Sequence, residues 1–241
     1  DISIEACAAD DMTVTAVNAG FAYSEAEVTL ASEDVTTFLE LDGASITEVC
    51  DYTVTYSDSQ GGTCPVEVTR TYVIVDACGN STNDIQTITV EDTEAPAVTG
   101  SITATTVQGC DTDDAPAAET TVAGLENLAG GLSIADACTA DGALNVTSSD
   151  ASTGTCPLVI TRTYVVQDAC GNTTADMVHT ITVDDTTAPV VTGSITDSPV
   201  EGCDASDAPA AETTVAGLEG LGDLMIADAC IADEDLTVTS S

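Results

Sequence analysis

The sequence predicts an all-β protein made of tandem β-sandwich domains that are joined end to end and stapled by disulfides. One stretch occurs twice, at 63–96 and 155–189, and both copies contain Cys-Pro, Thr-Arg-Thr-Tyr, Asp-Ala-Cys-Gly-Asn and Ala-Pro in that order. Val, Ile and Thr recur at strand period within each copy. Cys64 and Cys156 are 92 residues apart, a length that suits a β-sandwich and is too long for a solenoid repeat.

The chain is strongly acidic. Its 241 residues include two arginines, no lysine and 42 Asp and Glu, for a formal net charge of -40. Nucleic acid is thereby excluded as a partner, because its phosphates would be repelled. Hydrophobic residues still make up 43% of the chain, so burial can drive folding. Carboxylates at this density repel one another, and we therefore expect counter-cations to matter to the protein.

The spacing of the repeated stretch predicts three domains. The first, 1–94, lacks the opening strand and carries an insertion near 12–28, which we expect to form a strand or hairpin. The second domain is 95–187, and 188–241 is a partial third domain. Because residue 1 already matches the interior of a repeat, we expect the chain to be a slice of a longer protein.

Each repeat is expected to contain a short helical turn followed by a β-hairpin. Apolar residues three apart predict the helical turns, which lie near Val35, Val122 and Val215. A strand, a polar turn and a long strand beginning at Cys-Pro come next, which reads as a hairpin. The predicted strands cover 52–56, 66–75 and 144–147.

Ten cysteines predict a disulfide framework, because there is no Cys-x-x-Cys pair and only one histidine to support zinc or redox chemistry. Such a framework points to an extracellular location. By position in the repeat, the cysteines form a first class (Cys7, Cys110, Cys203), a second (Cys50, Cys138, Cys230), a third (Cys64, Cys156) and a fourth (Cys78, Cys170). No apolar run approaches the roughly 20 residues of a membrane-spanning helix.

Strand geometry argues against a bond between Cys64 and Cys78. The strand between them spans on the order of 30 Å, whereas a disulfide needs Cα atoms within roughly 7 Å. If the hairpin turns near Ser59 and Gln60, Cys50 lies on the side where Cys78 emerges, so we expect Cys50–Cys78 and Cys138–Cys170, which leaves Cys7–Cys64 and Cys110–Cys156. Cys203 and Cys230 then have no third-class or fourth-class partner. The rival scheme joins the first class to the second class inside each repeat.

One arginine lies in the middle of an otherwise apolar strand face in each full repeat. Arg70 shares its face with Val68 and Tyr72, and Arg162 occupies the equivalent position. Because these are the only basic residues, we interpret them as members of structural ion pairs with nearby carboxylates rather than as binding residues.

Four motifs carry a family resemblance. They are Cys-Asp-Tyr-Thr-Val-Thr-Tyr-Ser-Asp at 50–58, Thr-Arg-Thr-Tyr, Asp-Ala-Cys-Gly-Asn, and Gln-Thr-Ile-Thr-Val-Glu-Asp-Thr-Glu-Ala-Pro. They resemble hyalin-repeat-like, immunoglobulin-like modules of large surface adhesins and gliding-motility proteins of Bacteroidetes-type bacteria. The resemblance implies extracellular immunoglobulin-like sandwiches that serve as a stalk or adhesive fibre. Tyr72 and Tyr164 stand where the family usually has Trp, and the insertion at 12–28 has no counterpart.

Acidic residues gather where one domain ends and the next begins. Glu91 and Asp92 end the first domain, and Asp184 and Asp185 end the second, each just before Ala-Pro. Calcium prefers six to eight oxygen ligands from carboxylates and carbonyls, so these residues predict a calcium site. The alternative is a solvated acidic surface, because the sequence has no Asp-x-Asp-x-Asp-Gly loop.

The other polar residues have ordinary interpretations. His179 aligns with Gln86, and we expect it at an exposed strand position. Ser and Thr lack a neighbouring base and are interpreted as strand and turn residues. Asn80, Asn145 and Asn172 begin Asn-x-Ser/Thr triplets, which are glycan acceptors in a suitable cell, and a turn role is favoured for Asn80 and Asn172.

The sequence contains no catalytic constellation, which favours a non-enzymatic role. The leading hypothesis is an extracellular structural or adhesive repeat region that serves as a stalk or adhesin. Its expected partners are neighbouring repeats of the same chain or identical chains, and a surface glycan or protein ligand. Two alternatives are a self-assembling filament subunit with strand exchange, and a polysaccharide- or ice-binding module with flat Thr-x-Thr faces.

Overall fold

The computed structural model describes residues 2–12, 21–32, 34–35, 39, 45–48, 50–197 and 199–240. The chain forms two compact units, each assembled from separate segments. The first unit contains 1–102, 119–148 and 164–177, and the second contains 103–118, 149–163 and 178–241. The described secondary structure is mostly β with a few short helices, in agreement with the predicted all-β class.

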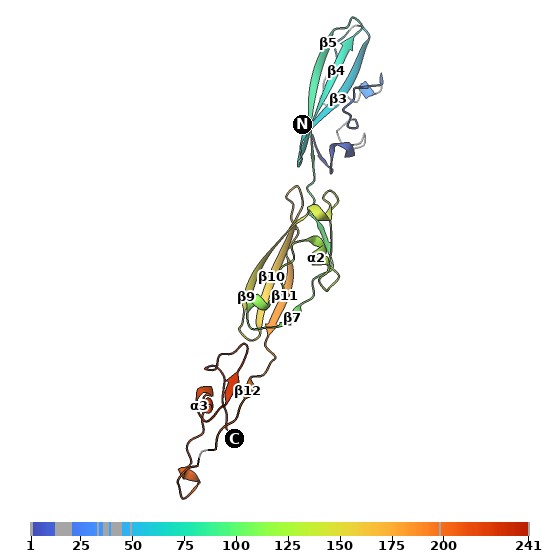
Figure 1. Cartoon of the computed structure of the whole chain (residues 1–241). Coiled ribbons are helices and arrows are strands. Elements are labelled where there is room, and N and C mark those ends of the chain that lie inside the picture. The colour runs from blue at the N-terminus through green and yellow to red at the C-terminus, as the bar shows by residue number, and fades with distance from the viewer. Residues whose placement is uncertain are drawn as a thin grey trace. The chain divides into compact units, whose positions relative to one another are not determined.

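A five-stranded sheet with the order β1-β5-β4-β3-β2 dominates the first unit (Figure 1). Its strands are β1 (Ile2–Glu5), β2 (Val28–Thr29), β3 (Tyr52–Gly62), β4 (Val66–Asp76) and β5 (Ser81–Glu91). β3 and β4 form an antiparallel hairpin, and β1 runs parallel to β5. Gly62 enters the turn with φ 82°, and a Cβ there would lie 2.5 Å from the Pro65 carbonyl oxygen, so the turn requires glycine.

Alternation along the strands buries one face of this sheet. Met12, Val68 and Ile88 belong to one buried cluster. Phe21 stacks on Tyr56 in a second cluster, with 5.4 Å between the ring centroids. Burial of one such side chain contributes roughly 1.5–3 kcal/mol. Part of the predicted insertion therefore covers the sheet with an aromatic side chain.

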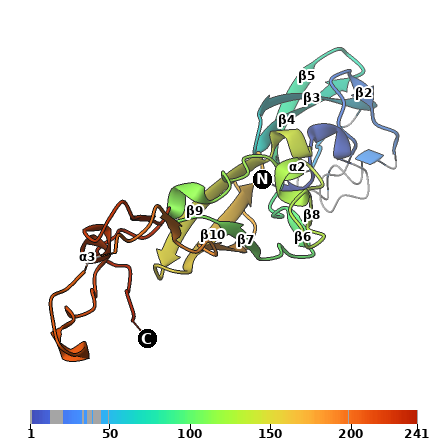
Figure 2. The same ribbon diagram turned by 60° about the horizontal axis from the view of Figure 1, so that its bottom comes forward.

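The remainder of the first unit comes from the second repeat. β6 (Ala97–Thr99) pairs antiparallel with β8 (Ser133–Ala135), and α2 (Val122–Glu126) packs against β8 (Figure 2). The Thr121 hydroxyl caps α2 by accepting a hydrogen bond from the Gly124 N–H at 3.0 Å. Leu125 of α2 is fully buried, which anchors the short helix.

The second sheet has the order β7-β11-β10-β9. Its strands are β7 (Thr105–Gln108), β9 (Asn145–Thr153), β10 (Leu158–Gln167) and β11 (Met177–Asp184). β7 runs parallel to β11, as β1 does to β5. In the second unit, Ile160, Ile181 and Val183 form a buried cluster. The partial third repeat adds β12 (Val190–Thr192), β13 (Met225–Ala227) and α3 (Val215–Glu219), with β12 paired to β13.

Several predicted elements match the described residues. α2 and α3 begin at Val122 and Val215, and Val35 has helical backbone. Short 3₁₀ turns at Ala9–Asp11, Thr112–Asp114, Asp141–Ala143 and Ala205–Asp207 were not expected. Within the predicted insertion, 13–20 lie outside the described residues, 21–23 are not in a strand, and only β2 pairs with the sheet.

Candidate functional site

Three disulfides cross-link the chain, and each joins one repeat to the next. The bonded pairs are Cys7–Cys138, Cys110–Cys230 and Cys64–Cys170, with Cα–Cα distances of 4.8, 4.9 and 5.2 Å. Two of them join a first-class cysteine to the second-class cysteine of the following repeat. The third joins a third-class cysteine to the fourth-class cysteine of the following repeat.

Both pairing schemes expected from the sequence are wrong. The argument that Cys64 cannot reach Cys78 holds, but a partner in the next repeat satisfies it as well as a partner in the same repeat. Neighbouring backbone at Ala77 and Asp51 is hydrogen-bonded at 3.0 Å, which brings the ends of β3 and β4 together without a disulfide between them. Four cysteines are unbonded and exposed, namely Cys50, Cys78, Cys156 and Cys203, and the favoured scheme had paired the first three of them.

Three carboxylates converge beside these cross-links in the first unit. One ligand oxygen from each of Asp92, Asp136 and Asp168 lies within 4.8 Å of the other two. Asp92 follows β5, Asp136 follows β8 and Asp168 follows β10, so the group draws on the first and second repeats. Asp92 and Asp168 are buried, at 5% and 6% exposure, and Asp136 is half-buried. We call Asp92, Asp136 and Asp168 the acidic triad.

Backbone N–H groups next to the disulfides orient the triad. Asp136 Oδ1 accepts from the N–H of Cys138 at 2.9 Å, and Asp168 Oδ1 accepts from the N–H of Cys170 at 2.8 Å. Both aspartates stand in an Asp-Ala-Cys motif, two residues before a cysteine that is bonded to the first repeat. The same motif therefore positions a carboxylate and makes a covalent link.

The Asp168 turn also holds the end of the first repeat. Asn172 donates from Nδ2 to Asp168 Oδ2 at 2.8 Å and to the backbone carbonyl of Asp92 at 2.9 Å. Its N–H donates to Asp168 Oδ1 at 2.8 Å. Asn80 makes the equivalent turn with Asp76, and both therefore have the turn role expected of them. Asn145, the third triplet, is exposed in β9.

Asp92 is the member of the triad whose ionised form is least favoured by its surroundings. Burial raises the pKa of Asp92 above its ordinary value, a hydrogen bond from the Glu94 N–H opposes that shift, and the charges of Asp136 and Asp168 add to it. Asp92 Oδ1 accepts that bond at 3.2 Å, while Oδ2 is buried and has no hydrogen-bond partner. Among the described residues, no donor therefore compensates a negative charge on Asp92 Oδ2.

The predicted metal-ligating residues overlap the triad only at Asp92. Glu91 pairs with Glu5 across β5 and β1, and Asp184 accepts the Gly109 N–H through its backbone carbonyl. Asp185 Oδ1 accepts from Gln108 Nε2 at 2.8 Å. Among the described residues, these three take no part in a cluster of ligands. Glu91 is next to Asp92 in sequence, whereas Asp184 and Asp185 lie more than 90 residues further along the chain.

Asp136 and Asp168 were missed by the sequence interpretation. Each lies more than 40 residues beyond Asp92, and no local spacing signals the contact. The available signal was the repeated Asp-Ala-Cys motif, which occurs at 76–78, 136–138, 168–170 and 228–230. In this motif the aspartate stands two residues before the cysteine. A disulfide from that cysteine to the preceding repeat therefore also brings the aspartate close to the preceding repeat.

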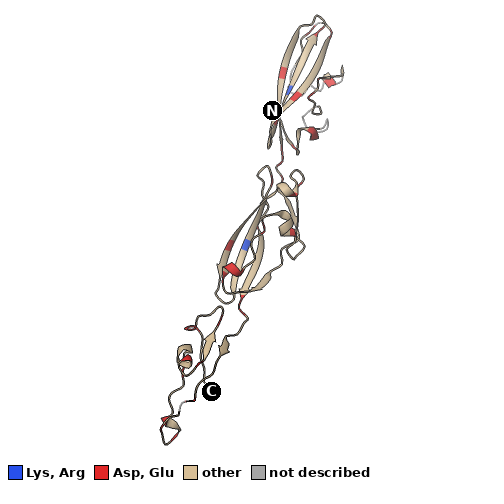
Figure 3. Ribbon diagram, in the orientation of Figure 1, with Lys and Arg blue, Asp and Glu red and all other residues tan. Residues whose placement is uncertain are grey.

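The two arginines, expected in structural ion pairs, each contact one aspartate. Figure 3 shows the basic positions, on β4 and β10. Arg70 Nε lies 2.8 Å from Asp58 Oδ1 with both side chains fully buried, and Arg162 Nε lies 2.8 Å from Asp150 Oδ1. Asp150 is 43% exposed in its side chain, so the second pair is in contact with water.

His179 does not occupy the exposed strand position expected for it. It is 3% exposed, and Nε2 lies 2.7 Å from the Thr105 hydroxyl. Burial lowers the pKa of His179, and the positive charge of Arg162 adds to that shift. Thr105 lies 74 positions away on β7, and the parallel pairing of β7 with β11 is what covers this histidine.

No family model matches the chain, and no curated protein matches it at a significant level. None of the described helices is long and apolar enough to cross a membrane. The three disulfides suggest an oxidising environment.

Proposed function

We propose that this chain is a non-enzymatic, extracellular structural region of a cell-surface protein or fibre, and that it works as a tension-bearing stalk. The carrying observation is that every disulfide joins one repeat to the next. Each bond lies inside one compact unit, but each also joins cysteines of consecutive repeats, so the bonds limit how far the array extends when it is pulled. The proposal includes immunoglobulin-like sandwiches of the hyalin-repeat-like type, which the Asp-Ala-Cys-Gly-Asn and Thr-Arg-Thr-Tyr motifs support.

The loops that the disulfides close overlap along the sequence, so a pulling force can pass through the disulfides instead of along the whole chain. Cys110 precedes Cys138 by 28 residues, so tension crosses the Cys7–Cys138 bond, returns to Cys110 and crosses to Cys230. The extensible path through the oxidised chain is then about 45 residues, or about 160 Å at ~3.6 Å per residue. The fully reduced chain would extend to about 860 Å at the same length per residue.

Single-molecule stretching between the two termini tests this proposal. The oxidised chain should reach a contour length near 160 Å, and addition of a reductant should raise it about fivefold. The double variant C7S/C138S should extend to about 430 Å when oxidised, because force must then run along the chain to Cys110. The matched control C156S/C203S changes only unbonded cysteines and should stay short. An oxidised chain that extends as far as the reduced one would refute a tension-bearing role.

A further inference from the structure

The acidic triad needs a positive charge that the described part of the chain does not provide. The chain has no lysine, and its two arginines are bound to Asp58 and Asp150. Three carboxylates whose oxygens lie within 4.8 Å of one another repel strongly, and two of them are buried. A buried charge is stable only when it is paired, hydrogen-bonded or bound to a metal ion.

The geometry of the triad suits a calcium ion. Calcium binds oxygen at 2.3–2.6 Å, so two oxygens on opposite sides of one ion are about 4.6–5.2 Å apart, and the triad fits within that span. Hydrogen bonds to Cys138 and Cys170 hold one oxygen of Asp136 and of Asp168. Asp92 Oδ2, buried without a hydrogen-bond partner, is the second observation that points to a ligand. We propose that Asp92, Asp136 and Asp168 bind one calcium ion that bridges the first and second repeats.

Calorimetric titration of the intact, oxidised chain with calcium chloride tests this site at matched ionic strength. We expect one site with a Kd on the order of 0.1–1 mM, the range of extracellular calcium modules. D92N and D168N should each weaken binding at least tenfold, and both keep an oxygen that can accept the neighbouring hydrogen bonds. D185N is the matched control, because Asp185 is the equivalent of Asp92 in the next repeat and lies outside the triad.

A second measurement guards against variants that misfold. In chelator, D92N should melt at a higher temperature than the unaltered chain, because it removes a buried charge without compensation. Millimolar calcium should then raise the melting temperature of the unaltered chain and of D185N, but not that of D92N. Equal calcium responses in D92N and D185N would overturn the site, and tighter binding of magnesium than of calcium would overturn the choice of metal.

The first repeat carries the same groups that join the second repeat to the one before it, and in the described residues these groups are not bonded to another repeat. By alignment of the repeats, Cys50 and Cys78 are equivalent to Cys138 and Cys170, and Glu48 and Asp76 are equivalent to Asp136 and Asp168. Asn80 matches Asn172, whose side chain donates to the backbone carbonyl of Asp92 in the preceding repeat.

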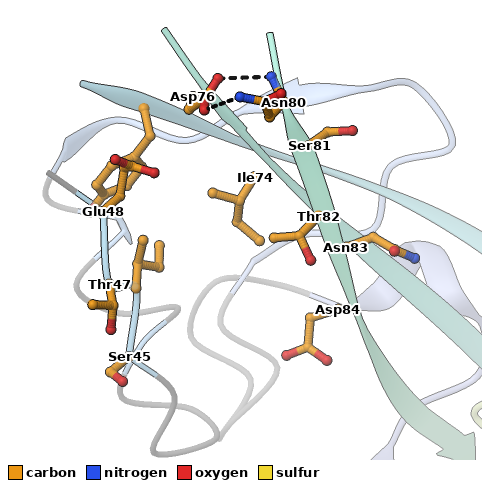
Figure 4. A pocket seen from close by; sticks show the side chains of 12 residues that line it. Ser45, Thr47, Glu48, Ile74, Asp76, Asn80, Ser81, Thr82, Asn83 and Asp84 are labelled. Atoms are coloured by element: carbon orange, nitrogen blue, oxygen red, sulfur yellow. Dashed lines mark hydrogen bonds between the residues drawn. The ribbon is translucent and has the colours of Figure 1, made fainter. Parts of the chain in front are cut away.

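Glu48, Asp76 and Asn80 line one cavity of about 480 Å³ (Figure 4). Figure 4 shows Glu48 across the cavity from the hydrogen-bonded Asp76 and Asn80, with Ile74 between the two sides. Cys50 and Cys78, each two residues from one of the two acidic residues, are exposed and unbonded. The cavity therefore has the composition of a junction whose other half is absent from the described residues.

We infer that this cavity is the docking site for the end of another repeat of the same type, an inference that rests on the proposed function. The occupant supplies an aspartate after its last strand, as Asp92 does, together with a first-class and a third-class cysteine. Each new disulfide forms from two thiols, which lose two protons and two electrons to a disulfide oxidant such as oxidised glutathione. That oxidant is reduced to two thiols.

A lengthened chain tests the docking site, with residues 104–196 duplicated directly ahead of Asp1. This junction keeps the repeat in register, because Cys7 aligns with Cys110 and Asp1 with Ala104. After oxidation with glutathione, peptide mapping should find Cys50 bonded to the duplicated Cys110, and Cys78 bonded to the duplicated Cys156. Cys50 and Cys78 should become resistant to alkylation in the lengthened chain. Serine at both duplicated cysteines is the control and should restore alkylation.

The outcomes separate this inference from the proposed function. If Cys7–Cys138 and Cys64–Cys170 form while Cys50 and Cys78 stay reactive or bond to each other, the docking site is refuted and the stalk is not. If the two original bonds also fail to form, the proposed function fails with it.

Discussion

The two arginine pairs offer a controlled comparison inside one chain. Asp58→Asn and Asp150→Asn remove the same charge from equivalent positions, and each leaves an arginine on the central strand of its sheet. Arg70 is fully buried, donates to both Asp58 oxygens at 2.8 and 2.9 Å, and lies 4.7 Å from the centroid of the Tyr56 ring. Burial lowers the pKa of Arg70, the hydrogen bond and charge of Asp58 raise it, and the net shift is upward.

The expected costs follow from exposure of the aspartate. Breaking a buried ion pair costs about 3–5 kcal/mol, because a charge is left in a medium that cannot solvate it. At Asp150, 43% of the side chain is exposed, so water replaces part of the lost carboxylate, although Arg162 itself is only 7% exposed, and the cost is about 1–3 kcal/mol. One kcal/mol shifts the melting temperature of a domain of roughly 60–100 residues by about 4–8 °C, so D58N should lower it by about 12 °C or more and D150N by clearly less.

Hydrogen exchange measured by mass spectrometry separates the two repeats in each variant. Peptides from β4 should lose protection in D58N while peptides from β10 keep it, and D150N should cause a smaller loss that is confined to β10. Arg70→Met together with Asp58→Leu replaces the pair by apolar groups and should recover most of the stability lost in D58N. Equal losses in D58N and D150N would show that burial of the pair does not set its energetic role, and the reasoning from exposure would be refuted.

Three further predictions test other parts of the fold. The folded pKa of His179 lies below its ordinary value of 6.5, so the stability that neutral His179 contributes is complete above that pH and decreases as the pH falls below it. A H179Q chain has the same carboxylates and should lose less free energy of unfolding than the unaltered chain between pH 7.5 and pH 5.5. Parallel pH profiles of the two chains would contradict this. Thr121→Ala removes the cap of α2 and should cost about 1 kcal/mol by chemical denaturation, with an unchanged stability arguing against the cap. Leu125→Ala should cost about 2–5 kcal/mol in the same assay, because Leu125 is fully buried, and a cost below 1 kcal/mol would mean that α2 is not packed as described.

Local patterns in the sequence were sufficient for the long hairpin strands and for the short helices. The alternation around Val68 and Tyr72 predicts β4, and the Cys-Pro dipeptide marks where this long strand begins. The apolar spacing at Val122 and Val215 predicts α2 and α3. Periodicity succeeds here because each signal lies within a dozen residues and depends on which side of one element is buried.

Contacts between distant segments were not predictable in the same way. The burial of His179 depends on the parallel strand β7, which no alternation within β11 reveals. The disulfides depend on which repeat supplies the partner, and equivalent cysteines carry no information on that choice. Asp92 was identified from its position before Ala-Pro, but its neighbours Asp136 and Asp168 come from a different repeat.

The Asp-Ala-Cys motif explains why cross-linking and cation binding should be coupled. In the second repeat, the cysteine of each of two motifs is bonded to the first repeat, and the backbone N–H of that cysteine holds the aspartate. Reduction of Cys7–Cys138 and Cys64–Cys170 would free both loops and allow three like charges to move apart. Calcium affinity should therefore fall in the reduced chain, and calcium should in turn slow the reduction of these two bonds while leaving Cys110–Cys230 unaffected. Equal protection of all three bonds by calcium, measured by timed alkylation, would show that the ion acts through the general acidity of the chain rather than through the triad.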